Sequence, residues 1–225
     1  MSVAWSFSSL TQYRNCPKQY HEVRFLKNFK EVKGEEALWG DRVHKSIEKY
    51  LTDGTPLLEG MDVWLPILES FRKLRGTLHV ENQLAITAGF QPCEWFAKDT
   101  WCRGIIDALW IDGTVAKAVD WKTGKRKPNS DQLALFALMV FAHYPAVEEV
   151  RTKFVWLKPG VVDPTETFTR DMIPQLWQLF LQDVKRIEYS IASNVWTPRT
   201  SGLCSAWCPV VTCSFNGKRR QGDAL

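Results

Sequence analysis

The most informative hydrophobic pattern is a pair of β-prone runs, at 105–111 and 114–120, separated by Asp112-Gly113. An Asp-Gly dipeptide between two such runs is a strong short-range signal for a β-hairpin. If these two residues form the turn, Asp107 faces Ala118 across the hairpin. The pattern therefore predicts a tight two-stranded unit with a defined register.

This register places the side chains of Asp107, Asp120 and Lys122 on one face of the hairpin, because side chains alternate between faces along a strand. Asp107 and Asp120 become diagonal neighbours, with Cα atoms about 7–8 Å apart. Two carboxylates at this distance can bind one ion. The hairpin therefore predicts a divalent-metal hydrolase site in which an amine accompanies the two acids.

Two surface carboxylates on an edge strand, facing water, are the alternative interpretation. An acidic residue two positions before a lysine occurs by chance about once or twice in a chain of ordinary composition. However, Asp107 interrupts an apolar run and Asp120 ends another. Acidic groups seldom point into a core unless they are paired or bind a metal, which favours the site.

Apolar spacing along the rest of the chain predicts helices and further strands. The helices fall at 8–26, 35–51, 61–75, 131–143 and 171–192. The strands fall near 79–86, 93–98, 152–157 and 165–170. Ser9 is expected to cap the first helix with Gln12 as its capping-box partner. Asn129-Ser130-Asp131 is expected to cap the helix at 131–143, and residues 201–213 are expected to be loop. We expect an α/β fold with a mixed β-sheet flanked by helices.

Composition supports one folded domain over residues 1–225. Hydrophobic residues make up 45% of the chain, charged residues 24%, and the net charge is +4. These are ordinary globular values and do not by themselves indicate nucleic acid. With no 18-residue apolar run and no apolar leader, we expect a cytoplasmic protein without a membrane partner. Six cysteines in a reducing compartment are then better suited to metal than to disulfides.

Five motifs occur in order along nearly the whole chain. They are Ser-Ser-Leu-x-x-Tyr-x-x-Cys-Pro at 8–17, Gly40-x-x-x-His44, Gly104-x-x-Asp107, Asp120-x-Lys122-Thr-Gly, and Gln132 followed by an apolar helix. Together they resemble the PD-(D/E)XK nuclease superfamily, in particular its RecB-like branch. The resemblance implies a restriction-endonuclease-like core.

The resemblance also implies roles for individual residues. His44, Asp107, Asp120 and the backbone carbonyl of Trp121 become metal ligands. Lys122 becomes the catalytic lysine and Gln132 a residue that positions phosphate or the site. Glu81 is a further acidic candidate ahead of the hairpin. The family commonly has Tyr four residues after the Gln, where this chain has Phe136, so no hydroxyl is available there.

These residue types suit phosphodiester hydrolysis. A divalent ion generates hydroxide at neutral pH and neutralises phosphoryl oxygens. Carboxylate oxygens suit Mg²⁺ or Mn²⁺, and one imidazole shifts the preference toward Mn²⁺. Lys122 lies beside carboxylates that favour its charged form, so we expect it to act by electrostatic stabilisation rather than as a general base.

Four cysteines, Cys16, Cys204, Cys208 and Cys213, form a one-plus-three arrangement. Some RecB-like nucleases, including AddB and the CRISPR adaptation nucleases, hold a [4Fe-4S] cluster with such an arrangement. The late spacing here is C-x₃-C-x₄-C, where the family usually has C-x₂-C-x₅-C. A [4Fe-4S] cluster that ties 1–34 to 194–215 is the leading interpretation; structural Zn²⁺ and free thiols are the alternatives. Cys93 and Cys102 are expected to be core residues, and 216–225 a flexible basic tail.

The leading hypothesis is a Mg²⁺- or Mn²⁺-dependent DNA exonuclease of the type used in phage or mobile-element recombination, acting on single strands or duplex ends. Contacts to the DNA backbone are expected from Lys18, Arg24, Lys125, Arg126 and Lys127. One alternative is a non-cleaving DNA-binding adaptor with a retained nuclease fold. Another is a zinc-ribbon-type binding protein.

Overall fold

The computed structural model describes residues 4–31, 33–126 and 131–218. Its backbone divides into two compact units. Unit 1 comprises Gly34–Leu179 with the first four residues of the chain, and unit 2 comprises Trp5–Lys33 and Phe180–Leu225. The assignment of 1–225 to one domain stays a prediction beside this division.

Unit 1 is built on a seven-stranded sheet in the order β2-β1-β3-β4-β5-β6, with β7 pairing with β5. The strands are β1 (Thr77–Thr87), β2 (Pro92–Cys93), β3 (Thr100–Asp112), β4 (Val115–Lys122), β5 (Glu149–Trp156), β6 (Val161–Val162) and β7 (Glu166–Thr169). Strands β4 and β5 run parallel, and the other pairs are antiparallel. The predicted mixed α/β class is confirmed. Because β3 and β4 are central strands, the edge-strand interpretation of their carboxylates is wrong.

Helix α5 (Asp131–His143) connects β4 to β5, as a parallel pair requires. Every side chain from Leu133 to Phe141 is buried, so the helix is apolar on all sides. Its predicted span is confirmed, whereas Asn129 and Ser130, the expected cap, lie outside the described residues.

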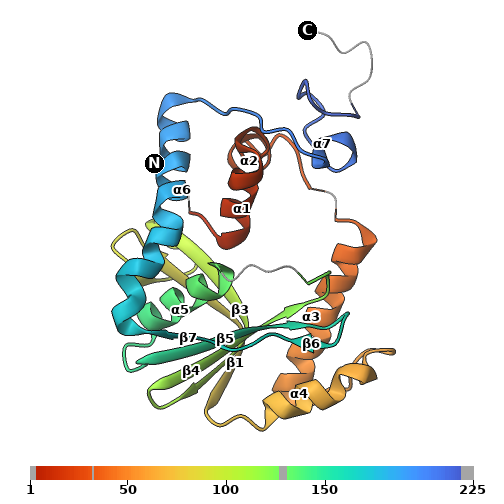
Figure 1. Cartoon of the computed structure of the whole chain (residues 1–225), viewed down its shortest axis with the longest axis vertical. Coiled ribbons are helices and arrows are strands. Elements are labelled where there is room, and N and C mark those ends of the chain that lie inside the picture. Colours follow the sequence, from red (N-terminus) through yellow and green to blue (C-terminus); the bar gives the residue numbers. More distant parts are fainter. Residues whose placement is uncertain (1–3, 32, 127–130, 219–225) are drawn as a thin grey trace. The chain divides into compact units, whose positions relative to one another are not determined.

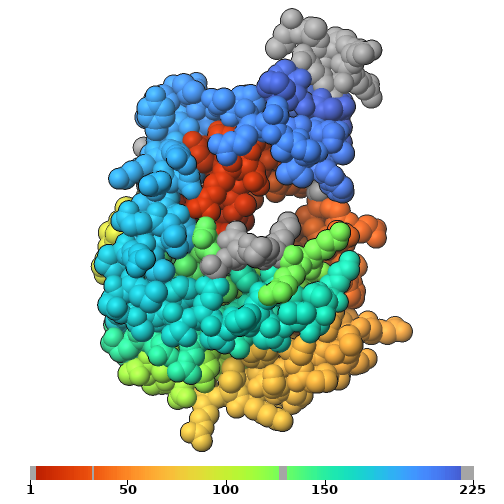
Figure 2. Space-filling model, viewed as in Figure 1, coloured from red at the N-terminus to blue at the C-terminus, as the bar shows by residue number. Residues whose placement is uncertain are grey.

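Helices α3 (Glu35–Asp53) and α4 (Leu65–Arg72) supply a second apolar layer. One hydrophobic cluster joins both helices to alternate residues of β3 and β4; its largest members include Val43, Ile47, Leu68, Phe71, Trp110 and Trp121. The predicted helix at 61–75 is shorter because Pro66 fits only a first turn, so the 3₁₀ turn η2 (Asp62–Trp64) precedes α4. Figure 1 shows these elements beside the sheet, and the outer side of α4 is visible at the surface in Figure 2.

The hairpin register differs from the prediction by two residues. Asp112 pairs with Val115 and Leu109 with Ala118, so the turn is Gly113-Thr114 and not Asp112-Gly113. Gly113 has φ +58°, which suits a hairpin turn with glycine in its first central position. Asp112 is therefore the last residue of β3. A two-residue shift keeps every side chain on its predicted face and brings Asp107 directly opposite Asp120.

Two further strands differ from what the sequence pattern indicated. The strand expected at 93–98 is limited to Pro92–Cys93, because residues 94–99 form successive turns. In these turns the Ala97 N–H donates to the Glu94 carbonyl and the Thr100 N–H to the Ala97 carbonyl. The short strand β6 was not predicted, since two residues carry no periodicity.

Unit 2 combines an early and a late part of the chain. The early part contains α1 (Phe7–Asn15), α2 (Pro17–Tyr20) and the π-helical turn η1 (His21–Phe25). The single helix expected at 8–26 is wrong, because Cys16 before Pro17 is extended, with φ −161°. The cap is also one turn earlier: Ser6 and Ser9 form the capping box, and Gln12 contacts Glu31 instead.

The late part of unit 2 begins within α6 (Ile173–Ser193), which follows the 3₁₀ turn η3 (Arg170–Met172). Inside the loop expected at 201–213, Leu203–Ala206 form the short helix α7. Trp196 stacks on His21 with ring centroids 4.4 Å apart, and the Tyr13 hydroxyl contacts Ser190 at 2.8 Å. Aromatic packing thus joins the two parts. None of the helices in the described ranges is both long and apolar enough to cross a membrane.

Gly113 gives a test of the hairpin turn. Gly113→Ala places a side chain at positive φ and should reduce the free energy of unfolding by about 1 kcal/mol. Gly124→Ala is the matched control, since its added methyl group meets open space. Urea denaturation of both variants would measure the difference, and equal midpoints would contradict the assigned turn.

Candidate functional site

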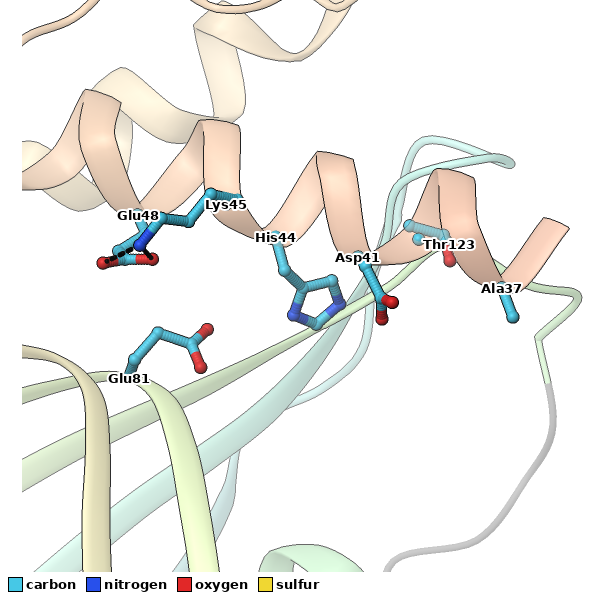
Figure 3. Close-up of a pocket in the computed structure, with 8 residues that line it drawn as sticks. Ala37, Asp41, His44, Lys45, Glu48, Glu81 and Thr123 are labelled. Atoms are coloured by element: carbon cyan, nitrogen blue, oxygen red, sulfur yellow. Dashed lines mark hydrogen bonds and ion pairs between the residues drawn. The ribbon is translucent and has the colours of Figure 1, made fainter. Parts of the chain in front are cut away.

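Three side chains from three different elements meet in unit 1. His44 of α3, Glu81 of β1 and Asp107 of β3 each place a potential ligand atom within 4.8 Å of the other two. Within the described ranges this is the only trio of His, Cys, Asp or Glu that meets this condition. His44 Nδ1 lies 3.4 Å from Asp107 Oδ2. In Figure 3, the His44 ring projects from its helix toward the strands, on the side where Glu81 lies.

Glu81 occupies a strained position. Its φ is +48°, a left-handed conformation that non-glycine residues rarely adopt inside a strand. Its neighbours Val80 and Asn82 pair with Ala108 and Ile106, so Glu81 lies opposite Asp107 where the ladder is interrupted. Such strain persists where the surrounding structure enforces it, and it is concentrated at functional sites. The strain supports a role for Glu81 in this site.

Asp120 lies deeper, with 3% of its surface exposed. Its Oδ1 accepts a hydrogen bond of 2.8 Å from Gln132 Nε2, and Lys122 Nζ lies 2.6 Å from its Oδ2. Lys122 also donates to Gln132 Oε1 at 2.9 Å. Gln132 therefore bridges the carboxylate and the ammonium from the first turn of α5. The Oδ2 atom is buried and accepts no hydrogen bond of good geometry within the described part of the chain.

Asp107 is fixed by the backbone of the neighbouring strand. Its Oδ2 accepts a 2.7 Å hydrogen bond from the backbone N–H of Trp121. The β3–β4 ladder runs as far as Ala108 and Val119. Beyond that pair the Asp107 side chain, rather than a backbone carbonyl, receives the next N–H. This contact orients Asp107 toward His44.

Burial and the charges of neighbouring side chains shift the pKa values of three groups in the site. Burial and the nearby Asp107 charge raise the pKa of Asp120 to about 7, although Lys122 opposes the shift. Burial alone would lower the pKa of His44, but its hydrogen bond to Asp107 and the surrounding carboxylates raise it to about 9. Burial and Asp107 also raise the pKa of Glu81. The site therefore concentrates negative charge that attracts either protons or a cation.

An open cavity of about 620 Å³ adjoins these residues. It is lined by Ala37, Gly40, Asp41, His44, Lys45, Glu48, Glu81 and Thr123. Gly40 has a steric reason to be glycine, because a Cβ there would lie 3.0 Å from Thr123 Oγ1. A side chain at this position would require either the Thr123 side chain or α3, which carries His44, to shift.

The donor set fits a divalent cation. Carboxylate oxygens and one imidazole are ligands that Mg²⁺ and Mn²⁺ accept. The buried Asp120 oxygen without a hydrogen-bond donor is a suitable additional ligand. In the structure, Asp120 is engaged by Lys122 and Gln132 and does not belong to the 4.8 Å trio. The backbone carbonyl of Trp121 as a ligand stays a prediction.

Most of the cations predicted to contact DNA are already paired with acids. Lys18 Nζ lies 2.7 Å from Glu22, and Arg24 donates to Gln12 with Glu31 at 3.8 Å. Asp163 holds Arg126 at 2.7 Å. Lys125 is exposed, and Lys127 lies outside the described residues. Their contacts with DNA stay predictions.

The four cysteines of the one-plus-three arrangement line one small cavity in unit 2. Cys16, Cys204, Cys208 and Cys213 border a volume of about 20 Å³. Burial and the other three sulfur atoms raise the pKa of the Cys208 thiol. No three of these sulfur atoms lie within 4.8 Å of one another. Cys102 is buried as predicted, whereas Cys93 is only half-buried.

Two residues that sequence reasoning missed brace the cysteine loop. The buried Asn216 side chain donates to the carbonyls of Cys208 and Val210, both at 3.0 Å. Gly217 N–H donates to the Cys204 carbonyl, and a Cβ on Gly217 would lie 2.7 Å from the Ser205 carbonyl. The Asn-Gly pair after the last cysteine was the available signal, since it marks a tight turn.

Comparison with known proteins now adds to this geometry. The family model described as the PD-(D/E)XK nuclease superfamily matches residues 4–213. A solved structure named "Putative exonuclease" from Eubacterium rectale has 11% identity and a TM-score of 0.57, covering 89% of this chain and 85% of that one. A second, named SSO0001, has 14% identity and a TM-score of 0.51, covering 96% and 88%. At these identities the likeness shows the fold alone. None of the curated proteins matches the chain in sequence.

The raised pKa values give the site a definite pH dependence. Below its pKa of about 9, His44 carries a proton that must leave before the ring can bind a metal. Asp120 likewise carries a proton below its pKa of about 7 and must lose it before it can bind the ion. Mn²⁺ should therefore bind more tightly as pH rises, by at least about tenfold between pH 6 and pH 8. Isothermal titration calorimetry would measure this, with His44→Ala giving weaker binding and a smaller dependence on pH. Equal affinity of the unmodified protein at both pH values would contradict the assignment.

Proposed function

The chain belongs to the PD-(D/E)XK nuclease superfamily, and we propose that it is a Mg²⁺- or Mn²⁺-dependent deoxyribonuclease of the RecB-like branch that digests DNA from an end. The observation that carries the proposal is the convergence of His44, Glu81 and Asp107 within 4.8 Å, beside a cavity open to substrate. Asp120, Lys122 and Gln132 form a hydrogen-bonded network next to this group. The two are coupled electrostatically, because the charge of Asp107 raises the pKa of Asp120.

In this proposal His44, Asp107 and Asp120 hold the metal ion, with Glu81 as a further ligand. When bound, the ion would acidify a water molecule and neutralise phosphoryl oxygens. The carboxylates need no large movement, because Asp107 is fixed by the Trp121 N–H and Asp120 by Gln132. Asp120 Oδ2 would exchange part of its contact with Lys122 for the ion.

Lys122 supplies a positive charge at the reacting phosphate. Its ammonium is held between Asp120 and Gln132 and lies 5.1 Å from the centre of the Phe154 ring. A compact cation held in this way can orient the attacking water and stabilise charge that develops on the phosphate. Gln132 acts as a positioning residue, since it contacts both members of the pair.

The RecB-like motif set favours an exonuclease over an endonuclease. The accompanying hypothesis is a role in DNA recombination or processing in a phage or mobile element. The structural neighbour from Eubacterium rectale carries an exonuclease name of its own. Lys125 and the other predicted cations would contact the phosphate backbone without reading sequence. The substrate class is therefore DNA, as single strands or duplex ends.

A [4Fe-4S] cluster at Cys16, Cys204, Cys208 and Cys213 is the second part of the proposal. Its support is that four thiols, one early and three late, border the same cavity. Tetrahedral zinc with Zn–S bonds of about 2.3 Å would draw sulfur atoms to about 3.8 Å from one another. Structural zinc at the same four cysteines is the alternative. When bound, this cluster would act as a structural tie between the early and late parts of unit 2.

The catalytic prediction concerns Asp120 and Lys122. Asp120→Ala and Lys122→Gln should each lower the cleavage rate by about a thousandfold or more, because they remove a metal ligand and a transition-state charge. Lys117→Gln, on the same strand, removes the same charge outside the site and should retain activity. Strand-resolved assays on end-labelled single- and double-stranded DNA with Mn²⁺ would measure the rates. Linear DNA should be digested and closed circular DNA spared; cutting of the circle would contradict an exonuclease.

The cluster prediction is spectroscopic. Protein purified without oxygen should contain about four iron and four sulfide per chain and show broad visible absorption. Cys208→Ala should lose the iron, whereas Cys93→Ala, outside the cavity, should keep it. Stoichiometric zinc, or no bound metal in the unmodified protein, would overturn the cluster and leave the nuclease site untouched.

A further inference from the structure

A second open cavity lies wholly within unit 2, outside the site already described. It has a volume of about 500 Å³ and is lined by Arg14, Asn15 and the consecutive residues Arg199, Thr200, Ser201, Gly202 and Leu203. The lining includes two arginines, an amide and two hydroxyl groups, and it contains no carboxylate. The volume is within the range of ordinary ligand pockets.

Arg199 is the cation in this cavity that retains N–H donors for a ligand. Its side chain donates to the backbone carbonyl of Arg14, in the last turn of α1, which holds the guanidinium in place. Among the ion pairs of the described residues, none joins Arg199 to a carboxylate. A guanidinium has five N–H donors, so most of them are available to a ligand. Lys18, Arg24 and Arg126 lack this freedom, because each already contacts an acid.

Arg14 supplies a second positive charge to the same lining. Asp183 pairs with its Nε at 2.6 Å and holds the side chain in one orientation. The exposed Thr200 and Ser201 add hydroxyl groups next to Arg199. A fixed guanidinium can form bidentate hydrogen bonds with phosphate oxygens, and the neighbouring hydroxyl groups can donate further ones.

We propose that this cavity binds a phosphate group of a DNA strand, with Arg199 as the principal contact and Arg14, Thr200 and Ser201 as its companions. The inference rests on DNA being the substrate and names a part of the chain, outside the metal site, that holds it. Phosphate contacts of this kind position a strand without reading its bases. An internal phosphodiester and a terminal 5′-phosphate share this chemistry.

The cavity is also linked to the cysteines. The backbone N–H of Arg199 donates to Cys16 Sγ at 3.4 Å, and Arg199 and Thr200 line both cavities. The segment that would contact phosphate is thus held in part by a thiol of the proposed cluster.

The test is DNA binding by the full chain without divalent metal, so that cleavage does not interfere. Fluorescence anisotropy with labelled single-stranded DNA should show that Arg199→Gln raises the Kd about tenfold at low salt. It should also reduce the slope of log K against log salt by about one. Lys185→Gln removes one exposed positive charge elsewhere in unit 2 and should change Kd less than about twofold. Arg199→Lys should recover part of the affinity.

Each outcome decides the proposal. If Arg199→Gln and Lys185→Gln weaken binding equally, or the unmodified protein does not bind DNA, the phosphate pocket is refuted. Oligonucleotides with 5′-phosphate and 5′-hydroxyl ends distinguish the two kinds of phosphate. If Arg199→Gln loses affinity only for the phosphorylated strand, the pocket binds the terminal phosphate; if it loses affinity equally for both, the pocket binds the backbone.

Cleavage is measured separately. A protein that binds DNA through Arg199 but never cuts would disprove the nuclease and keep the pocket, and a nuclease indifferent to Arg199 would do the reverse.

Discussion

The structure of unit 1 depends on keeping two carboxylates side by side in the middle of a sheet. Asp107 and Asp120 are both buried, and the Asp107 charge disfavours the charged form of Asp120. Burying charge without partners is costly enough to prevent folding or to force neutralisation. The chain compensates with two partners for each carboxylate. The Trp121 N–H and His44 both contact Asp107 Oδ2, whereas Gln132 contacts Oδ1 and Lys122 contacts Oδ2 of Asp120. What remains is a cluster with more acid than base, which is a suitable environment for a divalent ion.

Because the acids are on central strands, their positions are set by backbone hydrogen bonds rather than by loops. The β3–β4 ladder places Asp107 opposite Asp120, and β5 packs parallel to β4 along its whole length. The remaining members must be brought to this fixed pair. Gly40 lets α3 approach until His44 reaches Asp107, and the left-handed backbone at Glu81 interrupts β1 beside the same acid. Both are local costs in helix or strand stability that the functional geometry explains.

Much of this arrangement could be predicted because the side-chain period of a strand is two. Asp107, Asp120 and Lys122 were assigned to one site although the turn was placed one residue early, since a shift of two in pairing preserves the face of every side chain. Gly113 lies in the turn under either assignment, and the pairing of Asp112 with Val115 separates them. The strain at Glu81 and the bridging role of Gln132 could not be predicted in this way. Both depend on the distance between segments far apart in sequence, which no local pattern contains.

The same limit applies to unit 2, and it bears on how its cysteines come together. Cys16 and the late cysteines are nearly two hundred positions apart, and pattern alone suggested a metal as the tie between them. The structure provides protein contacts for that purpose: Trp196 stacks on His21, and the Tyr13 hydroxyl reaches Ser190 and the Arg186 carbonyl. Asn216 and Gly217 then brace the late loop from within. Aromatic packing and hydrogen bonds therefore contribute to placing four thiols and Arg199 around one cavity. A cluster bound there would add metal–sulfur bonds to these contacts and so strengthen the tie between the early and late parts of unit 2.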